Sequence, residues 1–219
     1  MKIRVVNIFI AAIILLVVAP LLSAKGGKLL SNDTASLTDV EIASILFMRE
    51  EEKLARDVYL TLGDFWSLTV FDNIAASEQQ HMNAMKKLVG KFALEDPVVD
   101  DNDVGSFAND ELSALYPALV GSGEQSRHEA LLVGAFIEEV DMEDIRFAID
   151  TTDRSDIRKV YESLLCGSRN HLRAFVAQIE SNGEVYESQL YPADDEWVAF
   201  INSVIDSPVE RSCGARKRR

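Results

Sequence analysis

Four segments of the chain carry apolar residues at helical spacing, and a carboxylate or an imidazole interrupts each apolar stripe near its middle. Steps of three and four residues place side chains on one face of a helix, and an apolar face packs against other helices. Burial of a lone carboxylate in such a core is costly unless an opposite charge compensates it. The interrupting residues are Glu52 in the first stripe, Glu78 and His81 in the second, Glu138 and Asp141 in the third, and His171 in the fourth.

No lysine or arginine occupies these stripes, so the acids have no basic partner there. Several carboxylates that converge on one core would also repel each other. Divalent cations are the simplest charges that could offset this repulsion. Glu78 and His81 stand three residues apart, so both side chains leave the same face of their helix. A Glu-x-x-His pair with glutamates from other helices is the ligand pattern of di-iron carboxylate bundles, and the sequence therefore predicts a buried metal site.

The order of the apolar segments predicts an all-α fold, because proline is scarce and strand-like alternation is nearly absent. We expect two long helices, a long acidic crossover, two further long helices and a short C-terminal helix. This layout is that of a ferritin-like four-helix bundle with one long crossover. The expected long helices span 38–63, 70–92, 124–149 (with a potential break near 142–144) and 155–183; the crossover spans 96–110, and short helices lie near 111–120 and 194–205.

The N-terminal segment has the order of a secretory signal. Lys2 and Arg4 precede an apolar run from Val5 to Ala19, and residues 22–24 offer a cleavage site, although Leu22 is larger than usual there. The segment is also long enough for a retained membrane anchor, and only then would the protein contact a membrane. In both cases we expect the folded part to be exported across the cytoplasmic membrane. The expected divisions are 1–24 signal peptide or anchor, 25–37 linker, 38–183 bundle, and 184–219 C-terminal extension with a short helix and a basic tail.

The net charge and the cysteines exclude some classes of partner and cofactor. The formal charge is −14, and removal of residues 1–24 takes away two positive charges and no acid, which leaves −16. Such an acidic chain repels the phosphates of nucleic acids, so we exclude nucleic acid as a partner. Cys166 and Cys213 could pair in an exported protein, but two isolated cysteines do not establish a disulfide. No Cys-x-x-Cys sequence occurs, which excludes a cysteine-ligated zinc or iron centre.

The four interrupted stripes resemble the helix motifs of rubrerythrin-type ferritin-like proteins. Glu52 with Tyr59 seven residues later is similar to the first-helix motif, and the segment 77–81 is similar to the second. The segments 138–142 and 167–175 resemble the third and fourth motifs. The resemblance covers about 38–182, and we identify this region as a poorly characterised ferritin-like family related to rubrerythrin.

The sequence departs from these motifs at two positions. Ser168 stands where the fourth helix of the family supplies a ligand glutamate, and Asp141 is one methylene shorter than the glutamate of the third motif. The site could therefore bind only one metal ion tightly. Alternatively, it could bind two ions, with a water molecule in place of the missing ligand. The four cysteines of the rubredoxin domain are absent, so the resemblance implies no attached electron carrier.

The resemblance implies a non-haem di-iron oxidoreductase that acts on oxygen or peroxide, with two iron ions, or manganese, as the cofactor. Two other functions stay open: an iron-sequestering protein without turnover, and a helical interaction module whose metal site has decayed. A homodimer is compatible with each of them. The expected ligands are Glu52, Glu78, His81, Glu138, Asp141 and His171, with Tyr59 and Ser168 beside them.

Each of these assignments has a rival. Glu52, Glu78 and His81 could instead form a polar network or lie on another helix face. His171 could be a core histidine bonded to the backbone or to Ser168, and Asp141 could be an exposed acid on a fraying helix turn. Glu139 competes with Glu138 as the ligand of the third long helix, and Glu138 is preferred because it continues the apolar stripe. Tyr59 is either a hydrogen-bond donor to a ligand carboxylate or an ordinary core aromatic residue.

Overall fold

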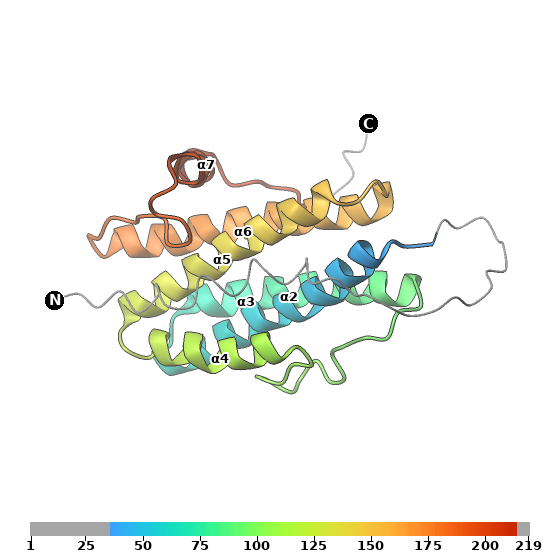
Figure 1. Ribbon diagram of the computed structural model, residues 1–219. Helices are drawn as coiled ribbons and strands as arrows, with labels where there is room; N and C mark the ends of the chain where they lie inside the picture. The colour runs from blue at the N-terminus through green and yellow to red at the C-terminus, as the bar shows by residue number, and fades with distance from the viewer. Residues whose placement is uncertain (1–35, 214–219) are drawn as a thin grey trace.

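The computed structural model describes residues 36–213, and all of the regular structure in that range is helical (Figure 1). The expected signal or anchor at 1–24, most of the linker and the basic tail at 216–219 lie outside the described residues. Within 36–213 no helix is both long enough and apolar enough to cross a bilayer. The helices are α2 (Asp39–Trp66), α3 (Thr69–Lys91), α4 (Asp110–Gly123), α5 (Arg127–Asp150), α6 (Ser155–Ser181) and α7 (Asp195–Asp206).

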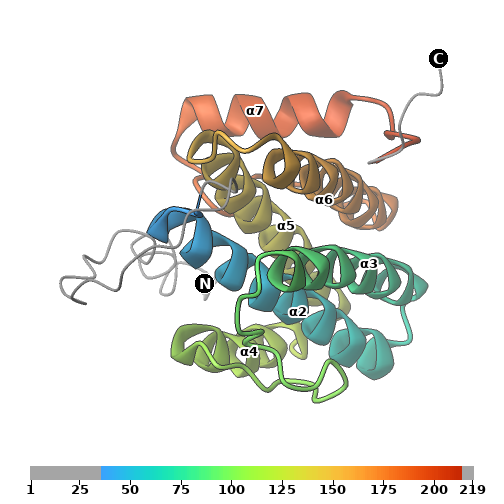
Figure 2. The same cartoon turned by 90° about the vertical axis from the view of Figure 1, so that its right-hand side faces the viewer.

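Four long helices form the core of the molecule. Helix α2 packs against α3, α5 packs against α6, and these two pairs meet where α2 contacts α5 and α3 contacts α6. The shorter α4 lies outside α2 and α5, whereas α7 crosses α6 on the opposite side of the core (Figures 1 and 2). The interrupted stripes of all four long helices therefore face one shared interior.

The helix ends follow local sequence signals. Thr38 caps α2 in a capping box, because its hydroxyl accepts the Glu41 N–H at 3.2 Å while the Glu41 carboxylate accepts the Thr38 N–H at 2.9 Å. The potential break near 142–144 is wrong, since α5 runs without interruption from Arg127 to Asp150. Met142 is fully buried in the middle of α5, so packing against the core holds this turn in the helix.

The long crossover between α3 and α4 covers one side of α2. Every residue of α2 from 48 to 59 is buried, including several charged ones. Arg49 forms ion pairs with two crossover acids, Asp101 and Asp96, the latter at 3.2 Å. Glu50 accepts the backbone N–H of Ala108 at 2.6 Å. These bonds satisfy the polar face of α2 and leave its opposite face free for the interior site.

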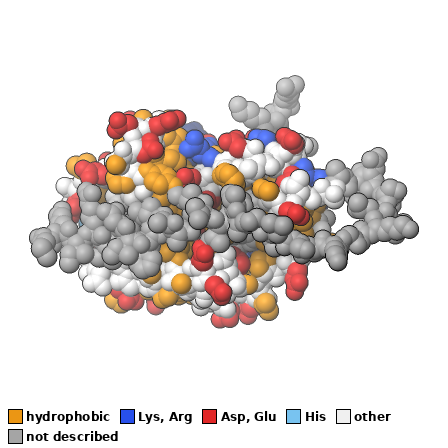
Figure 3. Space-filling model, viewed as in Figure 1, with side chains coloured by type: hydrophobic (Ala, Val, Ile, Leu, Met, Phe, Trp, Pro, Cys, Tyr) orange, Lys and Arg blue, Asp and Glu red, His pale blue; other side chains and the backbone are white. Residues whose placement is uncertain are grey.

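The C-terminal extension is tied to the core at two places. A disulfide joins Cys166 of α6 to Cys213, with the two Cα atoms 5.4 Å apart. The segment before α7 binds the buried carboxylate of Glu139 on α5, which accepts the Leu190 N–H at 2.9 Å and the Ser188 hydroxyl at 2.9 Å. In Figure 3 acidic side chains are scattered over the coloured part of the surface among hydrophobic and other side chains, and they outnumber the basic ones.

Candidate metal centre

The structure brings five of the six expected ligands together at the centre of the four long helices. Glu52, Glu78 and His81 form one group, with each ligand atom within 4.8 Å of the others. Glu78, Glu138 and His171 form a second group by the same measure, so Glu78 belongs to both. All five side chains are buried, and they come from α2, α3, α5 and α6.

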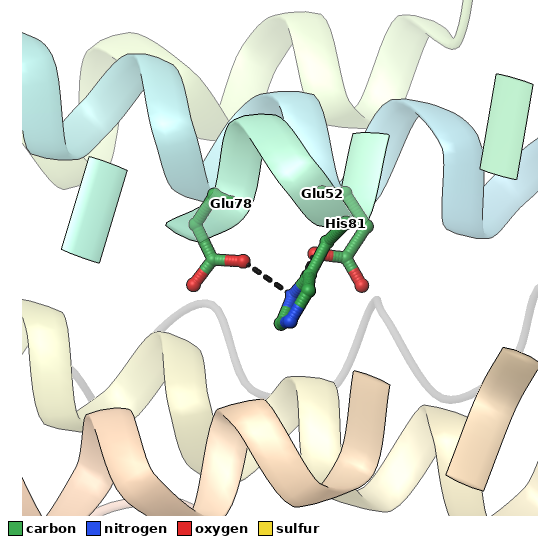
Figure 4. Close-up of side chains that lie close together, drawn as sticks. All are labelled: Glu52, Glu78 and His81. Carbon is green, nitrogen blue, oxygen red and sulfur yellow. Dashed lines mark hydrogen bonds and ion pairs between the residues drawn. The ribbon is translucent and has the colours of Figure 1, made fainter. Parts of the chain in front are cut away.

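The first group lies between α2 and α3. His81 Nδ1 is 2.7 Å from a Glu78 oxygen and 3.0 Å from a Glu52 oxygen, and Figure 4 shows the three side chains converging. The backbone of α6 packs directly against the imidazole at Gly167. A Cβ atom at this glycine would lie 2.4 Å from His81 Nε2, so any larger residue would displace the ring. Gly167 therefore sets the depth to which His81 enters the site.

The second group spans the interior from α3 to α5 and α6. His171 Nδ1 is 2.6 Å from the other Glu78 oxygen and 3.5 Å from Glu138. On the far side of the ring, His171 Nε2 lies 2.8 Å from the Ser77 hydroxyl. When Nε2 donates its proton to Ser77, Nδ1 presents a lone pair to the two carboxylates. Glu78 thus uses one oxygen toward each histidine, the arrangement of a bridging carboxylate.

The carboxylates and imidazoles of the site fit a metal better than they fit each other. Glu52 Oε1, both Glu78 oxygens and His171 Nδ1 are buried without a hydrogen-bond partner among the described residues. His171 Nδ1 and Glu78 Oε1 are only 2.6 Å apart. Buried ligand atoms that all lie within 4.8 Å of one another are what a shared cation requires. Carboxylate and imidazole donors suit iron and manganese.

Tyr59 contacts the candidate metal site, whereas Glu139, the sequence neighbour of Glu138, does not. The Tyr59 hydroxyl donates to Glu138 Oε1 at 2.6 Å, which orients this carboxylate toward His171. Tyr59 is also fully buried and packs against Phe71 and Phe175, so it serves the aromatic core as well. Glu139 points away from the site toward the C-terminal extension, where Tyr186 donates to it at 2.5 Å.

Asp141 and Ser168 lie beside the two groups and belong to neither. The Ser168 hydroxyl donates to Asp141 Oδ2, while Asp141 Oδ1 has no hydrogen-bond partner among the described residues. Ser168 also bonds to the Leu164 carbonyl at 3.0 Å within α6. Ser168 stands at the α6 position where the resembled family has a ligand glutamate, and here its hydroxyl donates a hydrogen bond to Asp141 of α5.

In the metal-free site, burial and neighbouring charges raise the pKa values of Glu52 and His171, so these two side chains hold protons. Burial raises the pKa of Glu52 to about 8, although His81 acts in the opposite direction. Burial alone would lower the pKa of His171, but Glu78 and Glu138 raise it to about 10. Burial likewise disfavours ionised Glu78, and the two histidines outweigh this effect and hold its pKa far below the usual range. A metal ion would therefore displace protons from the histidines as it binds.

Sequence reasoning missed two groups of residues around the site. Ser77 and Gly167 contact the two histidines, but a serine and a glycine carry no signal of this kind without a known helix pairing. Glu51 is buried beside the site, next to Glu52 in sequence. The run of three glutamates at 50–52 could have drawn attention to it, since consecutive residues of a helix cannot all face solvent when the helix is surrounded.

The fold and the site define an all-helical protein with a buried cluster of glutamates and histidines that could hold a metal ion. Residues 41–203 match a family described as an uncharacterized protein domain, DUF2202, and the chain belongs to this family. It is 45% identical over 175 residues to the uncharacterized protein MJ0754 of Methanocaldococcus jannaschii, with 80% of this chain and 94% of that protein covered. The crystal structure of the hypothetical protein MJ0754 matches this fold with a TM-score of 0.75 at 44% identity, and the match covers 82% of this chain and 99% of that one.

Proposed function

We propose that the chain is a ferritin-like protein that binds a dinuclear non-haem iron centre and acts as an oxidoreductase on dioxygen or peroxide. The observation that carries this proposal is the shared carboxylate. Glu78 directs one oxygen toward His81 and the other toward His171, and each histidine has a second carboxylate of its own. Two groups joined by one bridging glutamate supply ligands for two neighbouring cations.

The helix arrangement supports the ferritin-like part of the proposal. One ligand carboxylate comes from α2, a Glu-x-x-His pair comes from α3, another carboxylate comes from α5 and a histidine comes from α6. This distribution follows the four-helix pattern of the di-iron carboxylate bundles, apart from the missing glutamate at Ser168. The long crossover between α3 and α4 occupies the place that this layout requires.

The residues around such a centre would have three roles: terminal ligand, bridging ligand and orienting hydrogen-bond partner. Glu52, Glu138 and the two histidines would bind the ions at the ends, and Glu78 would bridge them. Tyr59 orients Glu138, and Ser77 orients His171. The burial of all these groups limits the access of bulk water. Iron bound here would supply one-electron redox chemistry toward dioxygen or peroxide.

Metal content tests the proposal directly. The full chain, purified without metal and then reconstituted anaerobically with iron(II), should bind about one to two equivalents of iron per chain, as measured by elemental analysis. Consumption of added peroxide by the loaded protein, above the rate of free iron, would establish turnover. Absence of bound transition metal after reconstitution with iron or manganese would refute the metal centre.

A protein that binds metal without turnover is a second candidate, and Ser168 favours it. The serine brings no negative charge to the α6 side of the site, so the second group offers fewer anionic ligands than the resembled family does. Ser168→Glu should increase the affinity of the weaker position in an iron(II) titration. If the wild-type protein already binds two equivalents with equal affinity, the serine leaves no deficient position and this candidate loses its support.

We further propose that the folded domain is exported. The disulfide between Cys166 and Cys213 supports this location, because disulfides persist mainly in oxidising compartments. The order of charges and apolar residues at the N-terminus supports it independently. Fractionation of the producing cells, combined with N-terminal sequencing of the protein, would show the chain outside the cytoplasm; recovery of reduced protein from the cytosol would contradict the proposal.

A further inference from the structure

A second set of acids lies between α2 and α5, next to the candidate metal centre. Glu51 and Asp141 are each 5% exposed, and Asp144 is half-buried one turn further along α5. Asp141 Oδ1 is buried without a hydrogen-bond partner among the described residues, and the buried carboxyl of Glu51 bonds that of Asp144, another acid. Burying carboxylate oxygens without donors reduces the stability of the fold. A cation that binds these oxygens would offset this cost.

The acids of α5 form a line from the surface toward the centre. Glu138, Asp141 and Asp144 recur every third residue, so they share one face of α5 and follow each other at about 4.5 Å along its axis. Their exposure falls in the same order, from half-buried Asp144 through Asp141 to Glu138 at 1%. The line therefore ends at a carboxylate of the second ligand group.

Electrostatic interactions show that Asp141 connects the outer acids to the inner ones. Burial and the negative charges of Asp144 and Asp141 raise the pKa of Glu51 well above its usual value. The pKa of Asp141 is itself raised well above its usual value, first by burial and then by Glu52 and Glu138. The outer acids and the centre are thus close enough to interact with each other electrostatically.

A narrow cavity between α2, α4 and α5 reaches two of these acids, Glu51 and Asp141. It has room for about one water-sized molecule, and its walls are mostly aliphatic and aromatic side chains of α2, α4 and α5. Glu51 and Asp141 are the two acids in its lining, so their side chains point into it. Figure 2 shows α4 beside α2 at this edge of the core.

We propose that Glu51, Asp141 and Asp144 form a transit site through which a divalent cation passes between solvent and the candidate metal centre. This inference rests on the proposed function, because a transit site needs a centre to serve. The half-buried Asp144 captures the ion, Glu51 and Asp141 hold it at the narrow cavity, and the line of α5 carboxylates delivers it to Glu138. Closely spaced negative groups in a low-dielectric passage raise the local concentration of cations and the rate of their association.

The rate of metal uptake tests this role separately from the final occupancy. Cobalt(II) is a suitable probe, because its visible absorption reports binding to carboxylate and imidazole ligands without oxidation. Stopped-flow mixing of cobalt(II) with metal-free full-length wild type, Glu51→Gln and Asp144→Asn would give the filling rates. We expect both variants to fill about tenfold more slowly than wild type, with the same final absorption. Glu162→Gln removes an equal charge from an exposed site on α6 and should fill at the wild-type rate.

The outcomes distinguish this inference from the proposed function. Equal filling rates in wild type, Glu51→Gln and Asp144→Asn would overturn the transit site and leave the metal centre intact. Reduced final absorption at an unchanged rate would also overturn it, because Glu51 would then be a ligand of the centre. Failure of wild type to bind cobalt(II) or iron(II) would overturn the metal centre itself. Asp144 is half-buried and replaceable by asparagine, so the test stands even if Glu51→Gln does not fold.

Discussion

The protein buries carboxylates in two regions, and it neutralises them in opposite ways. Along the crossover side of α2, Asp57 accepts hydrogen bonds from Arg56 at 2.6 Å and from the Gly105 N–H at 2.9 Å, and it also pairs with Lys53. At the centre of the four long helices, the described residues offer Glu52 and Glu78 no arginine, lysine or backbone N–H donor. Among basic groups, only the imidazoles of His81 and His171 approach these two carboxylates.

The difference indicates which buried acids belong to structure and which belong to function. A carboxylate surrounded by guanidinium, ammonium and backbone N–H groups has its charge satisfied inside the protein. A carboxylate surrounded by other acids and by imidazoles is satisfied only by protons or by a metal ion. The account therefore predicts that substitutions in the first region reduce stability, whereas substitutions in the second region mainly reduce metal binding.

The largest effect is expected from Glu78→Ala. This change removes the carboxylate shared by both ligand groups, so iron occupancy should fall at both positions. The loss of affinity should exceed the roughly 10–100-fold that follows removal of an outer hydrogen-bond partner. Elemental analysis and iron(II) titration would measure it, with exposed Glu162→Ala on α6 as the control. A Glu78→Ala protein that still binds the wild-type amount of iron would contradict the bridging role.

Asp57→Ala should produce the largest loss of stability, with no specific loss of metal binding. It leaves Lys53 and Arg56 buried without their carboxylate, which costs about 3–5 kcal/mol when a buried ion pair loses one partner. Urea unfolding followed by circular dichroism would measure the change, and Asp64→Ala at the exposed end of α2 should stay within about 0.5 kcal/mol of wild type. Recovery of full stability on addition of iron would show that the two regions are not independent.

A smaller effect is expected from Tyr59→Phe. The phenylalanine keeps the aromatic packing against Phe71 and Phe175 but removes the donor that orients Glu138. Affinity at the position between Glu78, Glu138 and His171 should fall by about 10–100-fold. Tyr161→Phe is the matched control. It removes a buried hydroxyl that lies outside the two ligand groups and forms a 3.0 Å hydrogen bond with Ser44. Equal losses of iron affinity in both variants would indicate a general packing defect.

The smallest effect is a dependence of stability on pH in the metal-free protein. The pKa of His171 is raised from 6.5 to about 10 by Glu78 and Glu138 against the effect of burial, so its contribution is complete below pH 6.5 and is lost as the pH rises to 10. Glu52 acts in the same direction between pH 4.5 and about 8, because burial keeps its carboxyl protonated in the folded state. Between pH 7 and 9 each half unit of pH should cost on the order of 1 kcal/mol, or about 2–4 °C in Tm.

Calorimetry of the metal-free and iron-loaded forms would separate the site from other titrating groups. Bound iron replaces the protons, so the loaded form should lose less stability over the same range and the gap between the two Tm values should widen with pH. A constant gap would mean that the protons on His171 and Glu52 are not linked to metal binding.

The helices and the side chains that converge at their centre could be predicted from the sequence, because both depend on local spacing. The six helices begin and end within about three residues of the expected positions. Glu52, Glu78, His81, Glu138 and His171 converge because each lies on the apolar stripe of its own helix. The preference for Glu138 over Glu139 followed from the same spacing, and the structure directs Glu139 to the C-terminal extension.

The residues that the sequence did not reveal depend on contacts between distant segments. Ser77 meets His171 across α3 and α6, a separation of 94 residues that no local period encodes. The crossover partners of the α2 bases are likewise distant in sequence: Arg49 pairs with Asp96, and Lys53 and Arg56 donate to backbone carbonyls of the crossover. The positions of these three bases at steps of four and three could have suggested a second buried face. Asp141 lay on the predicted stripe, but a one-turn offset sets it beside the ligand groups.

Anomalous diffraction from crystals of the full chain soaked with iron(II) tests the central claim most directly. Data collected on both sides of the iron edge would locate each ion relative to the side chains. The account predicts one anomalous peak among Glu52, Glu78 and His81 and a second among Glu78, Glu138 and His171, with the Glu78 carboxylate between them. Absence of iron at both positions, or iron bound only at surface acids away from Glu78, would contradict it.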